Sequence, residues 1–380
     1  MTQAPAMDIF WHDDVLFHDT GFGFFEAPEN PLLSVQMVHP ESADRIRNMK
    51  AVLQRGPVAQ SLRWHRGTHA SEADIVRFHD EAYVAEIKRA AHEGRRFSST
   101  TLLRPGAWPG LLAAAGTTLD AGRHVRETGA PAFALVRPPG HHAGRAMADG
   151  YCFFNHVGIA AEDALANGIG RVAIIDWDVH HGNGTQSGFY DRADVLTVSM
   201  HMDHGAWGPT HPETGGIDER GMGAGLGFNL NIPLPMGSSD TTYLGAFDEI
   251  VVPKVRAFKP DLLIMANGVD AGQFDPNGRQ LVTMSGFHAL ASRARALADE
   301  LCSGRLLVVQ EGGYNPAYAA FSVHSAIEGF AGLPESLKDP LGYMPQARER
   351  AERDVAALKA GILAGIESGR RTQKTGAFDA

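Results

Sequence analysis

Five short, unbroken apolar runs constrain the fold of this 380-residue chain more than any other feature. Runs of this length, without polar alternation, are typical of strands buried on both faces, as in a parallel sheet covered by helices. Segments with a helical pattern separate several of the runs, and this alternation of strand and helix predicts a doubly wound α/β domain. The five predicted strands are Ala132–Val136, Val172–Ile175, Val195–Val198, Leu262–Met265 and Leu306–Val309.

Helical patterns are found between the strands and on both sides of them. Apolar residues recur at approximate helical spacing in Glu72–His92, and Gly129 is a stop signal after Gly110–Thr128. By contrast, Phe10–Phe25 is predicted to form aromatic loops. With no repeat and no Pro/Gly/Ser-rich linker, we expect residues 1–380 to form one domain with a C-terminal helix and tail over 346–380. The predicted helices are Pro40–Gln54, Glu72–His92, Gly110–Thr128, Asn155–Asn167, Tyr243–Phe258, Gly286–Leu301 and Gln346–Ser368.

Charge and composition exclude several classes of function. The chain has 34 basic and 44 acidic side chains and a formal charge of −10, which argues against nonspecific binding to nucleic acid or to an acidic membrane. Its 2 cysteines cannot form a disulfide framework, so we expect a reducing compartment. Met1–Phe10 lacks the order of a signal peptide, and no apolar run is long enough to span a bilayer. We therefore expect a soluble, cytoplasmic protein with no nucleic-acid or membrane partner.

Polar, titratable or glycine-rich sequence follows each of the five predicted strands. Open α/β sheets bind ligands at the carboxyl ends of their strands, so these segments can converge on one crevice. One such coincidence would mean little, whereas five together indicate a functional site. The segments are Arg137–His142, Asp176–Gly184, Ser199–His201, Asn267–Asp270 and Glu311–Asn315.

The sequence Asp176-Trp-Asp178-Val-His180 carries the most specific chemistry. In extended backbone, alternate residues project to the same side, so two carboxylates and an imidazole would face one another. A divalent cation removes the electrostatic cost of this arrangement, and a catalytic zinc keeps three protein ligands and a water. Asp178 and His180 supply two ligands, and Asp270, after a neighbouring predicted strand, is the best third. Because the set contains two carboxylates, Fe²⁺ and Mn²⁺ remain alternatives to zinc.

Two further features offer proton transfer and hydrogen bonding. His141 and His142 follow Arg-Pro-Pro-Gly, where the prolines stiffen the turn and the glycine allows close backbone approach. A histidine transfers protons well near neutrality, especially when a carboxylate holds its other ring nitrogen, and Asp176 is available for that role. Tyr314, after two glycines, can donate a hydrogen bond to a developing oxyanion, although it could equally be an ordinary loop or core tyrosine.

Together these motifs resemble the zinc-dependent histone deacetylase superfamily, which includes bacterial histone deacetylase-like amidohydrolases and acetylpolyamine amidohydrolases. The resemblance runs from about His39 to Asn315 and is carried by RPPGHH, GYCFFN, DWDVHHGNGTQ, the Gly-x-Asp at 268–270 and EGGYN. It is nearer to the class II branch, since Asn183 stands where class I members usually carry aspartate. The resemblance implies an arginase-like three-layer α/β/α domain with a mainly parallel central sheet and a core of about residues 39–330.

The resemblance also assigns a role to each catalytic candidate. His142 would act as general base and then as general acid, while His141, paired with Asp176, would stabilise charge. Tyr314 would polarise the scissile amide carbonyl. The three zinc ligands would be Asp178, His180 and Asp270.

Two further sites are implied by the same resemblance. One is a structural potassium ion, held by side-chain or backbone oxygens of Asp176, Asp178, His180, Ser199 and Met200. The other is a narrow tunnel for a long substrate side chain, with walls that align roughly with Gly150, Tyr151 and Trp207. Tyr151 replaces the usual phenylalanine, and Ala266–Asp270 replaces the commoner Ser-Ala-Gly-Phe-Asp. These departures concern substrate preference, because the metal-binding aspartate itself is retained.

We therefore expect a zinc-dependent amidohydrolase that uses metal-activated water to remove acetyl or other short acyl groups from acylated lysine side chains or related amines. An acetylpolyamine deacetylase is the main alternative, since an acidic protein suits either cationic substrate. A dinuclear manganese ureohydrolase would need extra bridging ligands, and a noncatalytic acyl-lysine binding protein would not need Tyr314. A homo-oligomer is also possible: the run Phe22–Phe25 with Pro28–Pro31 could form a subunit contact, a loop over the entrance, or an irregular surface loop.

Overall fold

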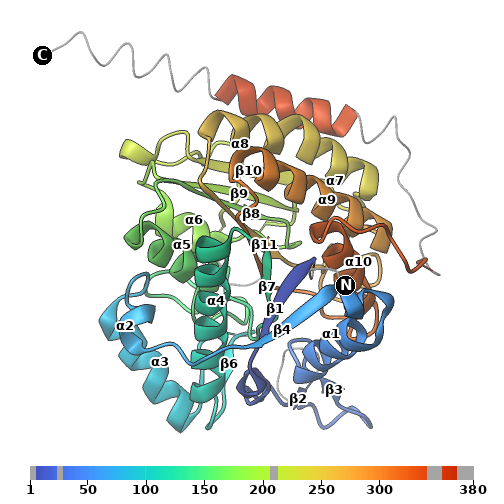
Figure 1. The fold of residues 1–380 in the computed structure, drawn as a ribbon. Helices are drawn as coiled ribbons and strands as arrows, with labels where there is room; N and C mark the ends of the chain where they lie inside the picture. The colour runs from blue at the N-terminus through green and yellow to red at the C-terminus, as the bar shows by residue number, and fades with distance from the viewer. Residues whose placement is uncertain (1–5, 24–28, 99, 206–212, 340–352, 366–380) are drawn as a thin grey trace, which may run out of the picture.

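A sheet of eight strands, parallel at every pairing, forms the centre of the computed structural model (Figure 1). The structure describes residues 6–23, 29–98, 100–205, 213–339 and 353–365. The strand order is β10-β9-β8-β11-β12-β7-β1-β4. Its strands are β1 (Met7–Trp11), β4 (Leu62–Arg66), β7 (Ala132–Ala134), β8 (Val172–Asp176), β9 (Val195–Met202), β10 (Asn229–Leu234), β11 (Leu262–Asn267) and β12 (Leu306–Gln310). Two small antiparallel pairs are β2 (Phe22–Gly23) with β3 (Met37–Val38) and β5 (Arg95–Arg96) with β6 (Leu102–Leu103).

Helices cover both faces of the sheet and give a three-layer α/β/α fold, as predicted (Figure 1). Helices α4 and α5 contact strands on one face, and α1, α9 and α10 lie on the opposite side. The α-helices are α1 (Ala43–Arg55), α2 (Glu72–Ile75), α3 (Glu81–Glu93), α4 (Trp108–Thr128), α5 (His156–Ala166), α6 (Asn183–Phe189), α7 (Asp240–Ala246), α8 (Val252–Phe258), α9 (Met284–Leu301) and α10 (Tyr318–Phe330). Shorter helices are η1 (Asp13–Leu16), η2 (Pro57–Ser61), η3 (Gly223–Gly225) and the π-helix η4 (Phe247–Val251).

The five predicted strands are confirmed, and they occupy five adjacent positions in the sheet, from β9 to β7. All residues of these strands are buried, which explains their continuous apolar sequence. Their C-terminal boundaries differ. Strand β7 ends at Ala134, and Leu135–Val136 continue as buried loop, whereas the other four strands extend past their predicted ends into polar residues.

The prediction of aromatic loops from Phe10 onward is wrong at its start, since Phe10 lies inside β1. A charged residue, Asp8, interrupts the apolar sequence of this strand, so its burial is not evident from the sequence. Asp8 is nevertheless 1% exposed, because it is ion-paired to Arg63 and His65 of β4. The strands β1, β4 and β10 all lack a continuous apolar run. Each carries polar or charged residues and lies toward an edge of the sheet, outside the five central strands.

The prediction of one helix over Glu72–His92 is also wrong, because the chain breaks into α2 and α3. The residues between them turn so that Phe78 enters the core, where its ring centroid lies 5.6 Å from that of Phe189. Asp80, in an extended conformation, is the N-cap residue that precedes α3. Apolar residues do recur at helical spacing on both sides of the break. The chain nevertheless leaves the helical conformation between α2 and α3, where Phe78 is buried.

The remaining helix predictions are confirmed with small shifts in their ends. Tyr243–Phe258 is helical throughout but starts earlier, at Asp240, and contains the π-helix η4. Helix α4 ends before Gly129, which has φ +72° and so is the stop that the sequence predicts. Residues 353–365 are helical, which agrees with the described part of the predicted C-terminal helix. In the described ranges, no helix has both the length and the apolar character needed to cross a bilayer.

Candidate active site

The loops that follow the central strands converge at the carboxyl edge of the sheet, as predicted from the chain order. The loop after β7 carries His141 and His142, and the loop after β8 carries Asp178 and His180. Asp270 follows β11 and Tyr314 follows β12. The contacts below join these loops pairwise, so residues far apart in the sequence share one site.

Three of these side chains form a cluster with the composition of a metal site. The potential ligand atoms of Asp178, His180 and Asp270 all lie within 4.8 Å of one another. Nδ1 of His180 is 3.1 Å from Oδ1 of Asp178 and 3.2 Å from Oδ2 of Asp270. Both carboxylates are fully buried. The structure therefore brings together the three residues that the sequence predicts as ligands.

Backbone N–H groups donate to both carboxylates, to Asp178 at both oxygens and to Asp270 at one. Gly312 N–H donates to Oδ2 of Asp178 over 2.8 Å, and Val179 N–H donates to Oδ1 of Asp270 over 2.8 Å. Oδ2 of Asp270 is buried and accepts no backbone N–H, and its contact is with Nδ1 of His180. Burial of Asp270 and the negative charge of the neighbouring Asp178 raise the pKa of Asp270 to about 8. A cation would satisfy this oxygen and lower that pKa, so the residues fit a divalent metal ion.

Two glycines allow the chain to approach these carboxylates. A Cβ on Gly312 would lie 2.2 Å from Oδ2 of Asp270, and one on Gly268 would lie 2.2 Å from Oδ2 of Asp178. Either contact is far shorter than van der Waals distance, so a larger residue would displace the carboxylates. The glycines of the Gly-x-Asp and EGGYN motifs thus shape the candidate metal site, and the set of one imidazole and two carboxylates matches the ligands that zinc accepts.

His141 is buried and paired with Asp176, the partner that the family resemblance implies. Its Nδ1 lies 2.8 Å from Oδ2 of Asp176, and its Nε2 lies 3.6 Å from Oδ1 of Asp178. Burial alone would lower the pKa of His141, but the charges of Asp178 and Asp176 outweigh it and raise that pKa well above its usual value. His141 therefore holds a positive charge beside the candidate metal ligands.

His142 lies next to His141 but has a different partner. Its Nδ1 is 2.6 Å from Oδ1 of Asn183, which is the first residue of α6. The two histidine rings have centroids 4.0 Å apart, and His142 is 6.1 Å from the ring of His180. A Cβ on Gly150 would lie 2.2 Å from Cδ2 of His142, so Gly150 lies directly against this ring. The amide of Asn183 can orient the imidazole without adding a negative charge.

Tyr314 is 4% exposed and lies on the same side of the site as Tyr151. Their rings meet edge to face with centroids 5.4 Å apart. Burial raises the pKa of Tyr314 well above its ordinary value, so the phenol stays protonated and can donate a hydrogen bond. Tyr151 has φ +70°, and its hydroxyl accepts a hydrogen bond from Asn277 over 3.0 Å. The third predicted tunnel residue, Trp207, lies outside the described residues.

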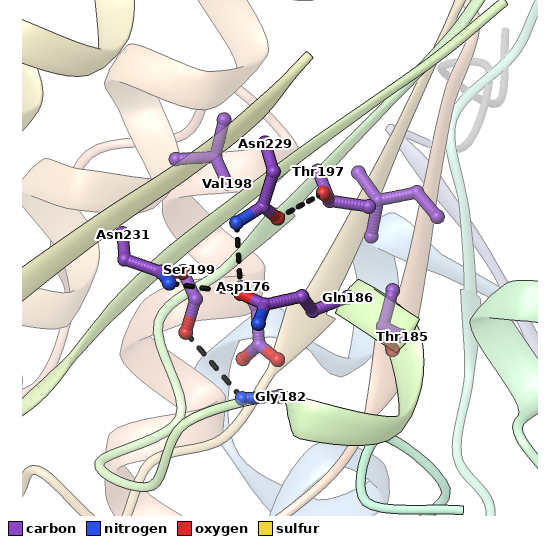
Figure 2. A pocket seen from close by; sticks show the side chains of 10 residues that line it. Asp176, Gly182, Thr185, Gln186, Thr197, Val198, Ser199, Asn229 and Asn231 are labelled. Atoms are coloured by element: carbon purple, nitrogen blue, oxygen red, sulfur yellow. Dashed lines mark hydrogen bonds between the residues drawn. The ribbon is translucent and has the colours of Figure 1, made fainter. Parts of the chain in front are cut away.

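Two of the predicted potassium ligands, Asp176 and Ser199, face a small polar cavity of about 10 Å³ (Figure 2). They are register partners across β8 and β9, and Ser199 Oγ accepts the N–H of Gly182 over 3.4 Å. Met200 is the next residue of β9, while Asp178 and His180 lie in the loop after β8. The cavity has room for about one water-sized particle, and a potassium ion here stays a prediction. Its other lining residues are Ile174, Gly182, Thr185, Gln186, Thr197, Val198, Asn229 and Asn231.

Sequence reasoning missed the residues that hold the catalytic candidates in place. Asn183 was noted only as a class marker, and Asp275, which accepts the N–H of Tyr314 over 2.6 Å, was not picked out. Arg137, at the start of RPPGHH, is fully buried and pairs with Glu41 over 2.8 Å. An arginine directly after a buried strand is a signal for such a pair, because a buried guanidinium needs a carboxylate partner.

Comparisons with known proteins agree with this arrangement. The family described as the histone deacetylase domain matches residues 39–330. The chain is 46% identical to histone deacetylase 8 of Arabidopsis thaliana over 359 residues, covering 93% of this chain and 95% of that one. It is 37% identical to a histone deacetylase-like amidohydrolase of Pseudomonas aeruginosa over 306 residues, covering 80% of each.

A solved structure is similar over nearly the whole chain. It is the crystal structure of the HDA15 HD domain, which matches with a TM-score of 0.77 and 29% sequence identity, covering 96% of this chain and 99% of that one. The sequence match, the shared fold and the converging strand-end loops point to the same group of amide hydrolases. The chain belongs to the histone deacetylase domain family.

Proposed function

We propose that this protein is a metal-dependent deacylase that hydrolyses acetyl or other short acyl amides of lysine side chains. Membership of a family of deacetylases and amidohydrolases supports the reaction class. The observation that carries the proposal is the meeting, in one buried site, of a two-carboxylate, one-imidazole cluster with a histidine pair and a protonated tyrosine. A binding protein for acyl-lysine would need none of these groups in such proximity.

The residues proposed to hold the metal are Asp178, His180 and Asp270. When bound there, a zinc ion would polarise the amide carbonyl and lower the pKa of a water. Hydrogen bonds from the backbone hold the two carboxylates in place. A cation would therefore bind to ligands that are already positioned. Fe²⁺ or Mn²⁺ also suits this set, and metal analysis of the protein as expressed distinguishes them.

The two histidines of the pair have different proposed roles. We assign the moving proton to His142, which takes it from the attacking water and gives it to the leaving amine. His141 keeps its own proton because Asp176 and Asp178 raise its pKa, so it supplies a fixed positive charge to the negative transition state. Tyr314 donates a hydrogen bond to the oxyanion formed from the carbonyl.

The approach to the site favours an extended substrate. Gly150 lies against His142 and Tyr151 against Tyr314, so these two residues are proposed as parts of the wall of the substrate tunnel. Asp176, Ser199 and the backbone near them are proposed to hold the structural potassium ion that the family resemblance implies. Such an ion would sit beside the carboxylate that orients His141.

The proposal is tested by a panel of acetyl-lysine peptides, longer acyl-lysine peptides and acetylated polyamines, assayed with zinc-reconstituted protein. We expect turnover of acyl-lysine peptides. A second candidate is acetylpolyamine deacetylation, which the formal charge of −10 suits as well as it suits the peptides, and it would show as faster turnover of the polyamines. Binding of these substrates without any release of acylate would contradict both.

Tyr314→Phe is expected to lower kcat on acetyl-lysine peptide by about 10²–10³-fold, because one oxyanion donor is lost. The ring still packs against Tyr151, so the fold and KM should change little. Steady-state kinetics measures the effect, and Tyr190→Phe, at a partly exposed position outside the site, is the control. Equal kcat for Tyr314→Phe and wild type would show that the phenol plays no electrophilic role.

A further inference from the structure

We propose that Glu311 is a positioning residue that ties the His141–His142 segment to the turn that carries Tyr314. This inference rests on the function proposed above and concerns the same site. Glu311 begins the EGGYN motif directly after β12, and it was not assigned a role from the sequence. It is fully buried, where a carboxylate is costly unless its hydrogen bonds are specific.

The carboxylate holds the backbone at the start of the histidine pair. One oxygen, Oε2, accepts the N–H of Gly140 over 2.6 Å and the N–H of His141 over 3.2 Å. The backbone of His156 and Phe154 lies close to Gly140, since a Cβ there would be only 2.7 Å from backbone atoms of both residues. The bonds therefore fix the position from which both imidazoles project.

The Glu311–Tyr314 turn is itself fastened to the rest of the site. Gly312 N–H donates to Asp178, and Tyr314 N–H donates to Asp275. From the opposite side, Arg45 donates to the backbone oxygen of Glu311 over 3.0 Å. The Glu311 side chain is thus the link by which this turn, already joined to a proposed metal ligand, also holds the histidine pair.

The side chain of Glu311 lies among polar groups in the interior of the protein. A carboxylate oxygen of Glu311, a ring nitrogen of His141 and Sγ of Cys152 lie within 4.8 Å of one another. The second oxygen, Oε1, is buried and receives no hydrogen bond. Burial raises the pKa of Glu311 to about 7 in spite of the two N–H donors and the charge of His141. An apolar side chain would fill this space without that cost, so the acceptor itself is the feature to test.

The test compares Glu311→Met with Glu311→Gln, both of which keep the length of the side chain. Methionine cannot accept the two N–H groups, and we expect kcat to fall by about 10–100-fold with KM and zinc content unchanged. Glutamine keeps a carbonyl acceptor of the same reach and should restore most of that loss. If Glu311→Met does not fold, Glu311→Ser, which is too short to reach Gly140, takes its place with the same expected loss.

Glu328→Met is the matched control, since Glu328 is a buried glutamate on α10 that is bonded to Ser336. It should leave kcat and KM at wild-type values. Wild-type kcat in Glu311→Met, or an equal loss in Glu311→Gln and Glu311→Met, would overturn the positioning role while the proposed function stands. Absence of turnover by the wild-type protein on the whole panel would overturn the proposed function and this inference with it.

Discussion

Replacing His142 with alanine is expected to lower kcat on acetyl-lysine peptide by about 10²–10⁴-fold, because the group that moves the proton is lost. The metal content should stay at the wild-type level, since His142 is not one of the three proposed ligands. The partner of its Nδ1 is the amide of Asn183, which does not accept or release a proton near neutral pH. Asn183 therefore cannot take over proton transfer when the imidazole is removed. His141 cannot replace it, because Asp176 and Asp178 keep that histidine protonated.

The measurement is steady-state kinetics together with metal analysis of the same protein samples. His92→Ala, which removes an exposed histidine at the end of α3, is the control for general effects of losing an imidazole. A His142→Ala protein with wild-type kcat would show that proton transfer was assigned to the wrong residue. A protein that loses both kcat and metal would place His142 among the ligands instead.

Asp178→Asn is expected to abolish turnover by removing the metal itself. Asparagine has the same shape, so the hydrogen bonds from Gly312 and His180 can be partly kept and the fold preserved. The lost negative charge should weaken zinc affinity by more than the roughly 10–100-fold that changes outside the ligand set cost. This distinguishes the variant from Glu311→Met, which should lose kcat with its metal retained.

Zinc content after dialysis against buffered zinc, measured by mass spectrometry, checks this prediction. Asp299→Asn, at an exposed position on α9, is the matched control and should bind zinc as the wild type does. Equal zinc affinity in Asp178→Asn and wild type would mean that the carboxylate cluster is not the metal site. A second zinc equivalent in the wild type would favour the dinuclear alternative.

The sequence identifies the centre of the fold better than its edges. Strands from β9 to β7 are buried along their whole length, and each contains a short apolar run that can be recognised without knowing its partner. The apolar run of β1 is interrupted by Asp8, whose burial is made possible by its pairing with Arg63, His65 and His124. A single sequence does not show such pairings between distant segments.

The same distinction holds within the candidate site. Asp178, His180 and Asp270 are recognisable because their chemistry and spacing, together with the rule that strand ends converge, place them at one edge. The groups that hold the reactive side chains follow from contacts that only the folded chain displays. Asn183 beside His142 and Glu311 beside Gly140 are ordinary polar residues in the sequence, and their roles depend on distances of 2.6 Å in each case.

A crystal structure of the zinc-loaded protein, with anomalous diffraction recorded on both sides of the zinc absorption edge, tests the central claim directly. We expect one strong anomalous peak that lies about 2.0–2.2 Å from an oxygen of Asp178, an oxygen of Asp270 and a ring nitrogen of His180. A peak elsewhere, or no peak between these three side chains in protein that hydrolyses acyl-lysine, would contradict it.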